Sequence, residues 1–360
     1  MSGAAPEVVS ARTDAGGVEP AGGPDAAPSW VIQQRKRLFS SRSPVWIFFV
    51  FLAIWAGFSI AAPSKFLVGF NVRSIFINAS VDGVMAVGMT FVIVTAGIDL
   101  SVGSVLVFSG VVAAKVMIAL AGSNVAGAGW GVIVPGLLVG IVAGTGWGLL
   151  QGFVITKGRL PPFIVTLGGF GAALGLAQVL TGGVDISNVP NALSNTIGNG
   201  QLGPFPWEVI IVAVVAILGG AVLNLTRFGR YTFAIGSNAE GARRVGIRVD
   251  RHLIKVYALM GLLSGVAGCL SLAHFTTTTL ASHTDDNLTV ITAVILGGTS
   301  LFGGLGTMFG TVVGVLIPVV LDSGLVIIGV QTFWQGVAVG VVLVIAVYAD
   351  QLRRRAAARP

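Results

Sequence analysis

The residues best placed to do chemistry in this sequence are polar groups that interrupt long apolar runs. The first is Asp99, which stands in the segment 96–104, Ala-Gly-Ile-Asp-Leu-Ser-Val-Gly-Ser. A carboxylate at membrane depth costs about 2.5–3.5 kcal/mol on insertion scales, so this position needs an explanation. Two interpretations stay open. Either Asp99 or Ser101 is a solvated helix cap in a short inner turn, or the segment is a helix break that lines a transport path. Spacing alone favours the turn.

A second polar segment, 226–251, is rich in arginine and contains a helix signal. The residues Ser-Asn-Ala-Glu at 237–240 have the form of a capping box, and Gly246 fits the glycine that ends a helix. We therefore expect a short helix over about 239–245 that presents two arginines. A helix this short is marginal alone in water. The loop either docks on another component or is simply a basic loop, and spacing does not separate these interpretations.

Two further segments combine hydroxyl groups with glycine or carboxylates. Segment 276–288 holds five threonines, a serine, a histidine and two aspartates, and its hydroxyls and carboxylates could hydrogen-bond a sugar. A solvated connector between helices is the simpler explanation. Segment 297–304, Gly-Gly-Thr-Ser-Leu-Phe-Gly-Gly, has too many glycines for a strong helix, because each weakens a helix by about 1 kcal/mol relative to alanine. It is either a site of tight packing or irregular backbone that faces a cavity.

Several kinds of chemistry are not expected. The sequence contains no GxxxxGK[ST] phosphate loop and no GxSxG nucleophile motif. With Cys269 as the single cysteine, no intrachain disulfide can form. The three histidines do not form an HExxH pair, so no metal site is expected. We therefore expect no cofactor on this chain, and no catalytic residues.

The composition is that of a membrane protein and not of a water-soluble one. It is 54% hydrophobic and 10% charged, with a mean hydropathy of +0.91, whereas soluble domains carry about 25% charged residues. The apolar residues form long unbroken runs and not the alternating pattern of a barrel. Because only helices or closed barrels can span lipid, we predict an all-α integral membrane protein.

About ten segments approach the roughly 20 apolar residues that a crossing requires. These predicted spans are 44–62, 74–96, 101–120, 130–155, 163–181, 207–225, 252–275, 287–304, 306–323 and 325–347. The predicted domains are a disordered tail over 1–43, a transmembrane domain over 44–350 and a basic tail over 351–360.

The basic residues predict an orientation. Lys and Arg are enriched in cytoplasmic loops. If the N-terminus is inside, ten crossings leave only Lys65, Arg73 and Lys115 of the 21 basic residues away from the inner segments. Both tails are basic, so the number of spans is expected to be even and both termini cytoplasmic. This asymmetry accounts for the formal charge of +7 without a nucleic-acid partner.

Glycines recur every four residues on several predicted helices, and this spacing lets helix backbones approach closely in lipid. Packing within the chain is the expected use, and a subunit interface is the alternative. The stripes are Gly136, Gly140, Gly144 and Gly148; Gly306, Gly310 and Gly314; Gly171 and Gly175; and Gly336 and Gly340.

Four ordered segments closely resemble the signature of ribose-type ABC importer permeases. They are 84–104, 160–168, 236–247 and 293–304, and the resemblance extends over about 44–350. It implies a homodimeric permease of the bacterial inner or plasma membrane, which works with a cytoplasmic ATPase and an extracytoplasmic sugar-binding protein. It also implies that the helix within 238–247 couples to the ATPase. Asp82 departs from the family, where Asn is more usual, and we assign it no role.

The candidate site residues follow from the motifs and the resemblance together. For ATPase coupling they are Ser237, Asn238, Ala239, Glu240, Ala242, Arg243, Arg244 and Gly246. For the translocation path or gate they are Gly97, Asp99, Ser101, Gly103, Thr299 and Ser300.

The sequence therefore predicts the permease subunit of an ATP-driven sugar importer, with ATP bound by a separate chain. The main alternative is a secondary transporter driven by an ion gradient, which expects ionisable residues near the midplane. Apart from Asp82 and Asp99 such residues are scarce. An intramembrane enzyme would need converging catalytic groups, which the sequence does not suggest. Ribose, xylose, arabinose, galactose and related polyols all stay open as substrates.

Overall fold

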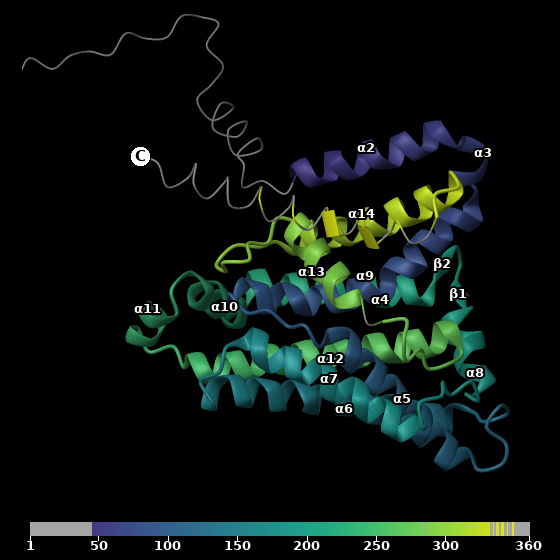
Figure 1. The fold of residues 1–360 in the computed structure, drawn as a ribbon, viewed down its shortest axis with the longest axis horizontal. Coiled ribbons are helices and arrows are strands. Elements are labelled where there is room, and N and C mark those ends of the chain that lie inside the picture. Colours follow the sequence, from purple (N-terminus) through teal and green to yellow (C-terminus); the bar gives the residue numbers. More distant parts are fainter. Residues whose placement is uncertain are drawn as a thin grey trace, which may run out of the picture. The chain divides into compact units, whose positions relative to one another are not determined.

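The computed structural model describes residues 45–283 and 285–331, together with a few isolated positions. Those positions are Trp334, Gly336, Val337, Gly340, Val341, Val344 and Tyr348. The described chain is built of helices, as predicted for an all-α membrane protein (Figure 1). Its sheet is one small antiparallel hairpin, β1 (Gln201–Leu202) with β2 (Phe205–Pro206). The predicted tails over 1–43 and 351–360 lie outside the described residues.

Seven described helices are long and apolar enough to cross a membrane. They are α4 (Gly69–Val94), α5 (Val102–Ala121), α6 (Trp130–Lys157), α7 (Pro162–Thr181), α9 (Trp207–Leu225), α12 (Val249–Phe275) and α14 (Met308–Ile327). Seven of the predicted spans are thereby confirmed, with bounds that differ by a few residues.

The predicted count of about ten spans is wrong. The first apolar helix, α2 (Val45–Ala61), has 17 residues and is about 26 Å long. The predicted span 287–304 is instead α13 (Asp286–Leu296), whose 11 residues cover only about 16 Å of a hydrocarbon core near 30 Å. Helix α13 ends at Leu296, and the turn that follows contains three glycines with positive φ, Gly298, Gly303 and Gly304. Most of the predicted span 325–347 lies outside the described residues.

Short elements connect these helices at the two ends of the bundle. Helices α10 (Arg227–Ser237) and α11 (Ala239–Arg244) lie at one end in Figure 1. Helix α8 (Asn191–Leu193), the π-helical turn Ser194–Gly198 and the β1–β2 hairpin lie at the other. A further short helix, α3 (Pro63–Phe66), joins α2 to α4.

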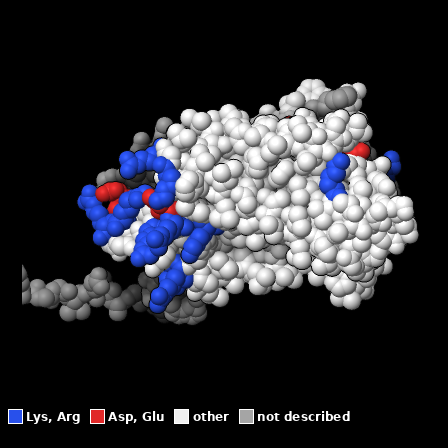
Figure 2. All heavy atoms as spheres, turned by 90° about the horizontal axis from the view of Figure 1, so that it is seen from below, with Lys and Arg blue, Asp and Glu red and all other residues white. Residues whose placement is uncertain are grey.

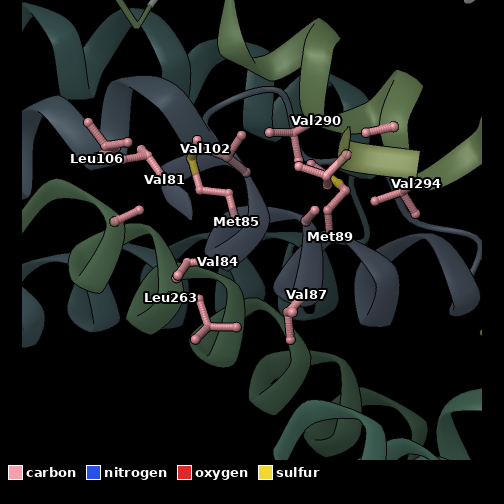
Figure 3. Close-up of a cluster of buried hydrophobic side chains, with 14 of the residues drawn as sticks. Val81, Val84, Met85, Val87, Met89, Val102, Leu106, Leu263, Val290 and Val294 are labelled. Atoms are coloured by element: carbon pink, nitrogen blue, oxygen red, sulfur yellow. The ribbon is translucent and has the colours of Figure 1, made fainter. Parts of the chain in front are cut away.

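The core is formed mainly by α4, α5, α12 and α13. Val290 and Val294 of α13 join Met85 and Met89 of α4 in one buried cluster (Figure 3). By contrast, few side chains of α7 and α9 are buried although these helices are strongly apolar. Exposed apolar helices in a membrane protein face lipid or another subunit, and the buried half-length helix α13 does neither.

The glycine stripe of α6 confirms packing within the chain. A Cβ at Gly148 would overlap the carbonyl oxygen of Tyr257, and one at Gly144 would lie 2.5 Å from the carbonyl oxygen of Gly261. Both partners belong to α12, so the α6 and α12 backbones touch. On α14, Gly310 and Gly314 contact the backbone of α13 and the turn after it in the same way.

The stripe on α7 behaves differently. A Cβ at Gly171 or Gly175 would meet nothing within 4 Å. The same is true of Gly336 and Gly340. These positions leave the subunit-interface interpretation open.

Charged side chains gather at the ends of the molecule on the face that Figure 2 shows. One end is densely basic, and a broad zone without Lys, Arg, Asp or Glu separates it from sparser charges at the other. The basic end includes α10 and α11, and we call it the arginine-rich end. This distribution fits a protein with an apolar surface in the lipid bilayer and with both ends exposed to water.

Candidate functional site

The segment 95–101 is a non-helical turn that connects α4 to α5. The N–H of Gly97 bonds to the carbonyl of Val92, and Ala96 adopts a positive φ of 62°. Positive φ is uncommon for a residue other than glycine and marks a tight change of direction. Helix α5 begins only at Val102, so the polar residues 99 and 101 belong to irregular backbone.

Asp99 is buried, with a relative exposure of 2%. Its Oδ1 accepts hydrogen bonds from the backbone N–H of Ser101 at 2.8 Å and from the Ser101 hydroxyl at 2.6 Å. The Ser101 hydroxyl in turn accepts from Nε2 of Gln151 at 2.9 Å. Gln151 is six residues before the end of α6, about 9 Å along the helix. The interpretation of Asp99 as a solvated cap is therefore wrong. Ser101 does occupy the N-cap position of α5, but its side chain makes no capping bond.

Tyr257 of α12 completes this polar cluster. Its side chain is 1% exposed, and its hydroxyl has no hydrogen-bond partner within the described residues. A Cβ at Gly97 would lie 2.7 Å from that hydroxyl. Glycine at 97 thus lets the turn pack against the tyrosine. A buried hydroxyl without a hydrogen bond costs roughly 1–3 kcal/mol of folding free energy. Tyr257 therefore destabilises this arrangement.

The start of α5 meets the start of α13. The N–H of Gly103 donates to Oδ1 of Asn287 at 2.7 Å, and a Cβ at Gly103 would overlap the carbonyl oxygen of His283. The His283 ring bridges the Ser271 hydroxyl at 2.7 Å and the Asp286 carboxylate at 2.6 Å. The half-length helix is therefore held by side-chain bonds at its first turn.

The turn after α13 packs on the turn after α4. The N–H of Gly304 donates to the carbonyl of Val94 at 2.9 Å, and Gly303 lies against Ala96. Thr299 and Ser300 are both 1% exposed, and the Thr299 hydroxyl has no partner within the described residues. Segment 297–304 is thus a site of tight packing. All six predicted path residues are buried in two adjoining segments, and their role in a path stays a prediction.

Helix α11 forms where the sequence predicted a short helix, but its cap is different. Oδ1 of Asn238 accepts the N–H of Gly241 at 2.8 Å. Ser237 is the last residue of α10, so the predicted capping box of Ser237 with Glu240 is wrong. The prediction for Gly246 is confirmed: its φ is 86°, and its N–H bonds to the carbonyl of Arg243 at 3.0 Å. Together with a bond from the next N–H to Ala242, this is a Schellman end.

Two contrasting faces characterise α11. Ala242 is buried with Ile235 of α10 and Val249 of α12 in a small cluster that fixes α11 to its neighbours. At the end of the helix, Arg244 is exposed and the next residue, Val245, is 77% exposed. An apolar side chain at the tip of a basic hairpin is a typical contact for another protein.

The four resembling segments meet at one junction. Gly236 packs so closely on Val94 that a Cβ would overlap its carbonyl oxygen. Thr166 of α7 donates its hydroxyl to the carbonyl of Ile98 at 3.3 Å, and Gly304 bonds to Val94 as described. We call these contacts around residues 94–104 the motif junction.

Comparison with known proteins identifies the family of this chain. The family model described as a branched-chain amino acid transport system permease component matches residues 71–347. The ribose import permease of Bacillus subtilis is 38% identical over 81% of this chain and 88% of its own length. The D-allose permease of Escherichia coli is 33% identical (85% of this chain, 90% of the relative), and the fructose import permease of Rhizobium meliloti is 32% identical (93% and 92%). No solved structure matches the chain.

The chain belongs to the family of monosaccharide ABC importer permeases. It is thus a transport component and not an enzyme, and it is a multi-pass membrane protein. These relatives are named for different sugars, namely ribose, fructose and D-allose, so family membership does not select a sugar.

In this permease the segment 276–288 combines exposed residues with buried, hydrogen-bonded ones. The Thr278 hydroxyl donates to Oδ1 of Asp185 at 3.2 Å and accepts the N–H of Ile186 at 2.8 Å. The N–H of Leu280 also donates to Asp185, at 2.9 Å. The loop is fastened to the segment before α8, and its buried Thr278 is not free to bind a sugar.

Sequence reasoning missed three side chains of the permease. Gln151 had a weak signal, as a lone amide in the apolar run of α6. Tyr257 had none, because a tyrosine near a helix end is an ordinary interfacial residue. Asp185 gave no hint of its partners, which are about 90 residues away and joined to it only by the fold.

Proposed function

We propose that this permease forms the translocation path of an ATP-driven sugar importer and receives the motion of a separate cytoplasmic ATPase through α11. The observation that carries the proposal is the connection from α11 to the motif junction. The exposed residue Val245 directly follows α11, whose buried side is fixed to α10 and α12, and Gly236 near the end of α10 touches Val94.

The connection gives a physical route for coupling. A rigid-body shift of α11 would move α12 with it, because Ala242 and Val249 share one small core. The same shift would press the last turn of α10 on the 94–97 turn, where no side chain separates the two backbones. Since packed interfaces are bistable and not continuously deformable, such a push favours a switch between two arrangements.

The motif junction is where that switch would act on the path. Asp99, Ser101 and Gln151 form a hydrogen-bonded cluster between α5 and α6, next to an unpaired Tyr257 hydroxyl. An unpaired group is inexpensive to rearrange, because it has no bond to lose. In the outward and inward states of the importer these groups would exchange partners and open or close the route for sugar.

The partners follow from the family and the surface. The arginine-rich end would face the cytoplasm with the ATPase, and the opposite end, with its fastened 276–288 loop, would receive a sugar-loaded binding protein. A second copy of the chain would pack on the open glycines of α7, Gly171 and Gly175. Both termini would then be cytoplasmic.

The test is a Val245→Asp variant, co-expressed with the ATPase and the binding protein. A charge at a desolvated contact costs about 2 kcal/mol or more, so we expect copurification of the ATPase to fall at least about thirtyfold. Val184→Asp is the matched control, since Val184 is 69% exposed at the opposite end. Unchanged copurification and unchanged ATPase stimulation in Val245→Asp would refute the role of α11.

The rival is the ion-driven secondary transporter, for which the buried Asp99 is the relevant observation. Vesicles that contain only this chain separate the two mechanisms. Uptake of sugar that follows an imposed ion gradient without the ATPase would support the rival, whereas uptake that requires ATPase and ATP supports the importer.

A further inference from the structure

We infer that the corner between α9 and α10 binds an anionic phospholipid, with the phosphate held by Arg227, Arg230 and Tyr231 and the acyl chains lying on α9. This site is separate from the ATPase contact on α11 and does not depend on the direction of the chain in the membrane.

The exposed residues of α10 form one basic face. Arg227, Arg230 and Tyr231 are all exposed, and their i, i+3, i+4 spacing places them side by side. The opposite face, with Thr232 and Ile235, is buried against the bundle. A helix with one apolar face docked and arginine and tyrosine on the other suits the headgroup region of a bilayer.

Neither arginine has a carboxylate partner in the part of the chain that the structure describes. Elsewhere in the same hairpin, Arg243 pairs with Asp250 at 2.5 Å and Arg244 pairs with Glu240 at 3.4 Å. None of the ion pairs found among the described residues involves Arg227 or Arg230. Their positive charge is therefore available to a phosphate, for which arginine's planar fork of donors is well matched.

The neighbouring surface is apolar and continuous with this face. Helix α9 ends at Leu225, which is 77% exposed, and the preceding turns expose Ile217 and Leu218. Only Thr226 separates α9 from α10. Acyl chains along α9 would thus end beside the arginines of α10.

The corner is rigid. The Thr226 hydroxyl donates to the carbonyl of Val222 at 2.6 Å and accepts the N–H of Gly229 at 3.3 Å. One side chain therefore bonds both to the last turn of α9 and to the first turn of α10. A Cβ at Gly229 would overlap the carbonyl oxygen of Leu223. A preorganised corner loses little entropy when a lipid binds, which favours a defined site over diffuse attraction.

The test uses the full chain reconstituted in phosphatidylcholine vesicles with spin-labelled phosphatidylglycerol or spin-labelled phosphatidylcholine. The motionally restricted fraction gives the relative association constant of each lipid. One surface arginine contributes a factor of about five toward an anionic lipid. We expect the double variant Arg227→Gln/Arg230→Gln to lower the preference for phosphatidylglycerol by about 25-fold, or to remove it.

The matched control is Arg248→Gln/Arg251→Gln, which removes the same charge from exposed arginines at the start of α12. It should keep the preference nearly unchanged. An equal loss in both double variants would overturn the site, because it would mean diffuse attraction. Added inorganic phosphate should not displace the lipid; displacement would mean a site for a free anion. If the α10 variant loses ATPase copurification and keeps its lipid preference, the face is a protein contact and the inference is wrong.

Discussion

The close contact between α6 and α12 yields a sharp prediction for Gly148→Ala. The added Cβ would overlap the carbonyl oxygen of Tyr257 and lie 3.0 Å from the Cα of Gly261. Both obstacles are backbone atoms, so no side chain can rotate away and the two helices must separate. Overpacking of this kind costs typically about 1–3 kcal/mol.

Helix propensity acts in the opposite direction. Replacing glycine by alanine within a helix contributes roughly 1 kcal/mol of stability. We therefore expect Gly148→Ala to lose up to about 2 kcal/mol in net stability. Gly146→Ala is the matched control on the same helix, because a Cβ there meets nothing within 4 Å. The control should be neutral or more stable by up to about 1 kcal/mol.

A native cysteine can report on the α6–α12 interface. Its single cysteine, Cys269, is buried on α12, and its thiol contacts the carbonyl of Leu137 on α6 at 3.6 Å. A thiol-reactive dye in detergent should label it only when α6 and α12 part, so thermal labelling curves report the relevant unfolding. Gly148→Ala should shift the midpoint down and Gly146→Ala should not. Equal midpoints of thermal labelling in the two variants would refute the close packing of α6 on α12.

Three further predictions concern the motif junction and the loops. Tyr257→Phe removes an unpaired buried hydroxyl without changing shape, so thermal stability should stay equal or rise while sugar transport falls, as measured in reconstituted vesicles with the ATPase; full transport would contradict a role in switching. Asn238→Ala should cost α11 about 1 kcal/mol and raise amide exchange over 239–244, whereas Ser237→Ala should have little effect; the reverse order would restore the capping box. Asp185→Ala frees the Thr278 hydroxyl and the Leu280 N–H, so limited proteolysis should cut within 276–283 faster than in the parent chain; equal cutting rates would mean that the loop is held by other contacts.

Much of the fold was readable because membrane helices need long apolar runs. The bounds of α9, predicted as 207–225, agree with Trp207–Leu225, and α7 differs by one residue. Few residues of these helices are buried, so nearly every position in them is apolar and the run marks the helix from end to end. The half-length helix α13 was not readable, since its apolar residues continue through 301–302 and only backbone φ values distinguish a turn from a helix there.

The candidate site was predicted in part. The position of α11 and its terminal Gly246 followed from local rules, because caps act within a few residues. The choice of Asn238 over Ser237 as the cap depended on where α10 ends, which the local pattern does not contain. The burial of Asp99 depended on Gln151 and on α12, and partners so distant in sequence are set by tertiary packing alone.

The most direct test of the account is the side of the membrane on which α11 lies. In a Cys269→Ser background, a Val245→Cys variant would be treated with a membrane-impermeant thiol reagent in intact cells and in inside-out vesicles. The account predicts labelling in the inside-out vesicles only, with protection when the ATPase is bound. Labelling in intact cells without labelling in inside-out vesicles would place α11 outside, and no cytoplasmic ATPase could then act on it.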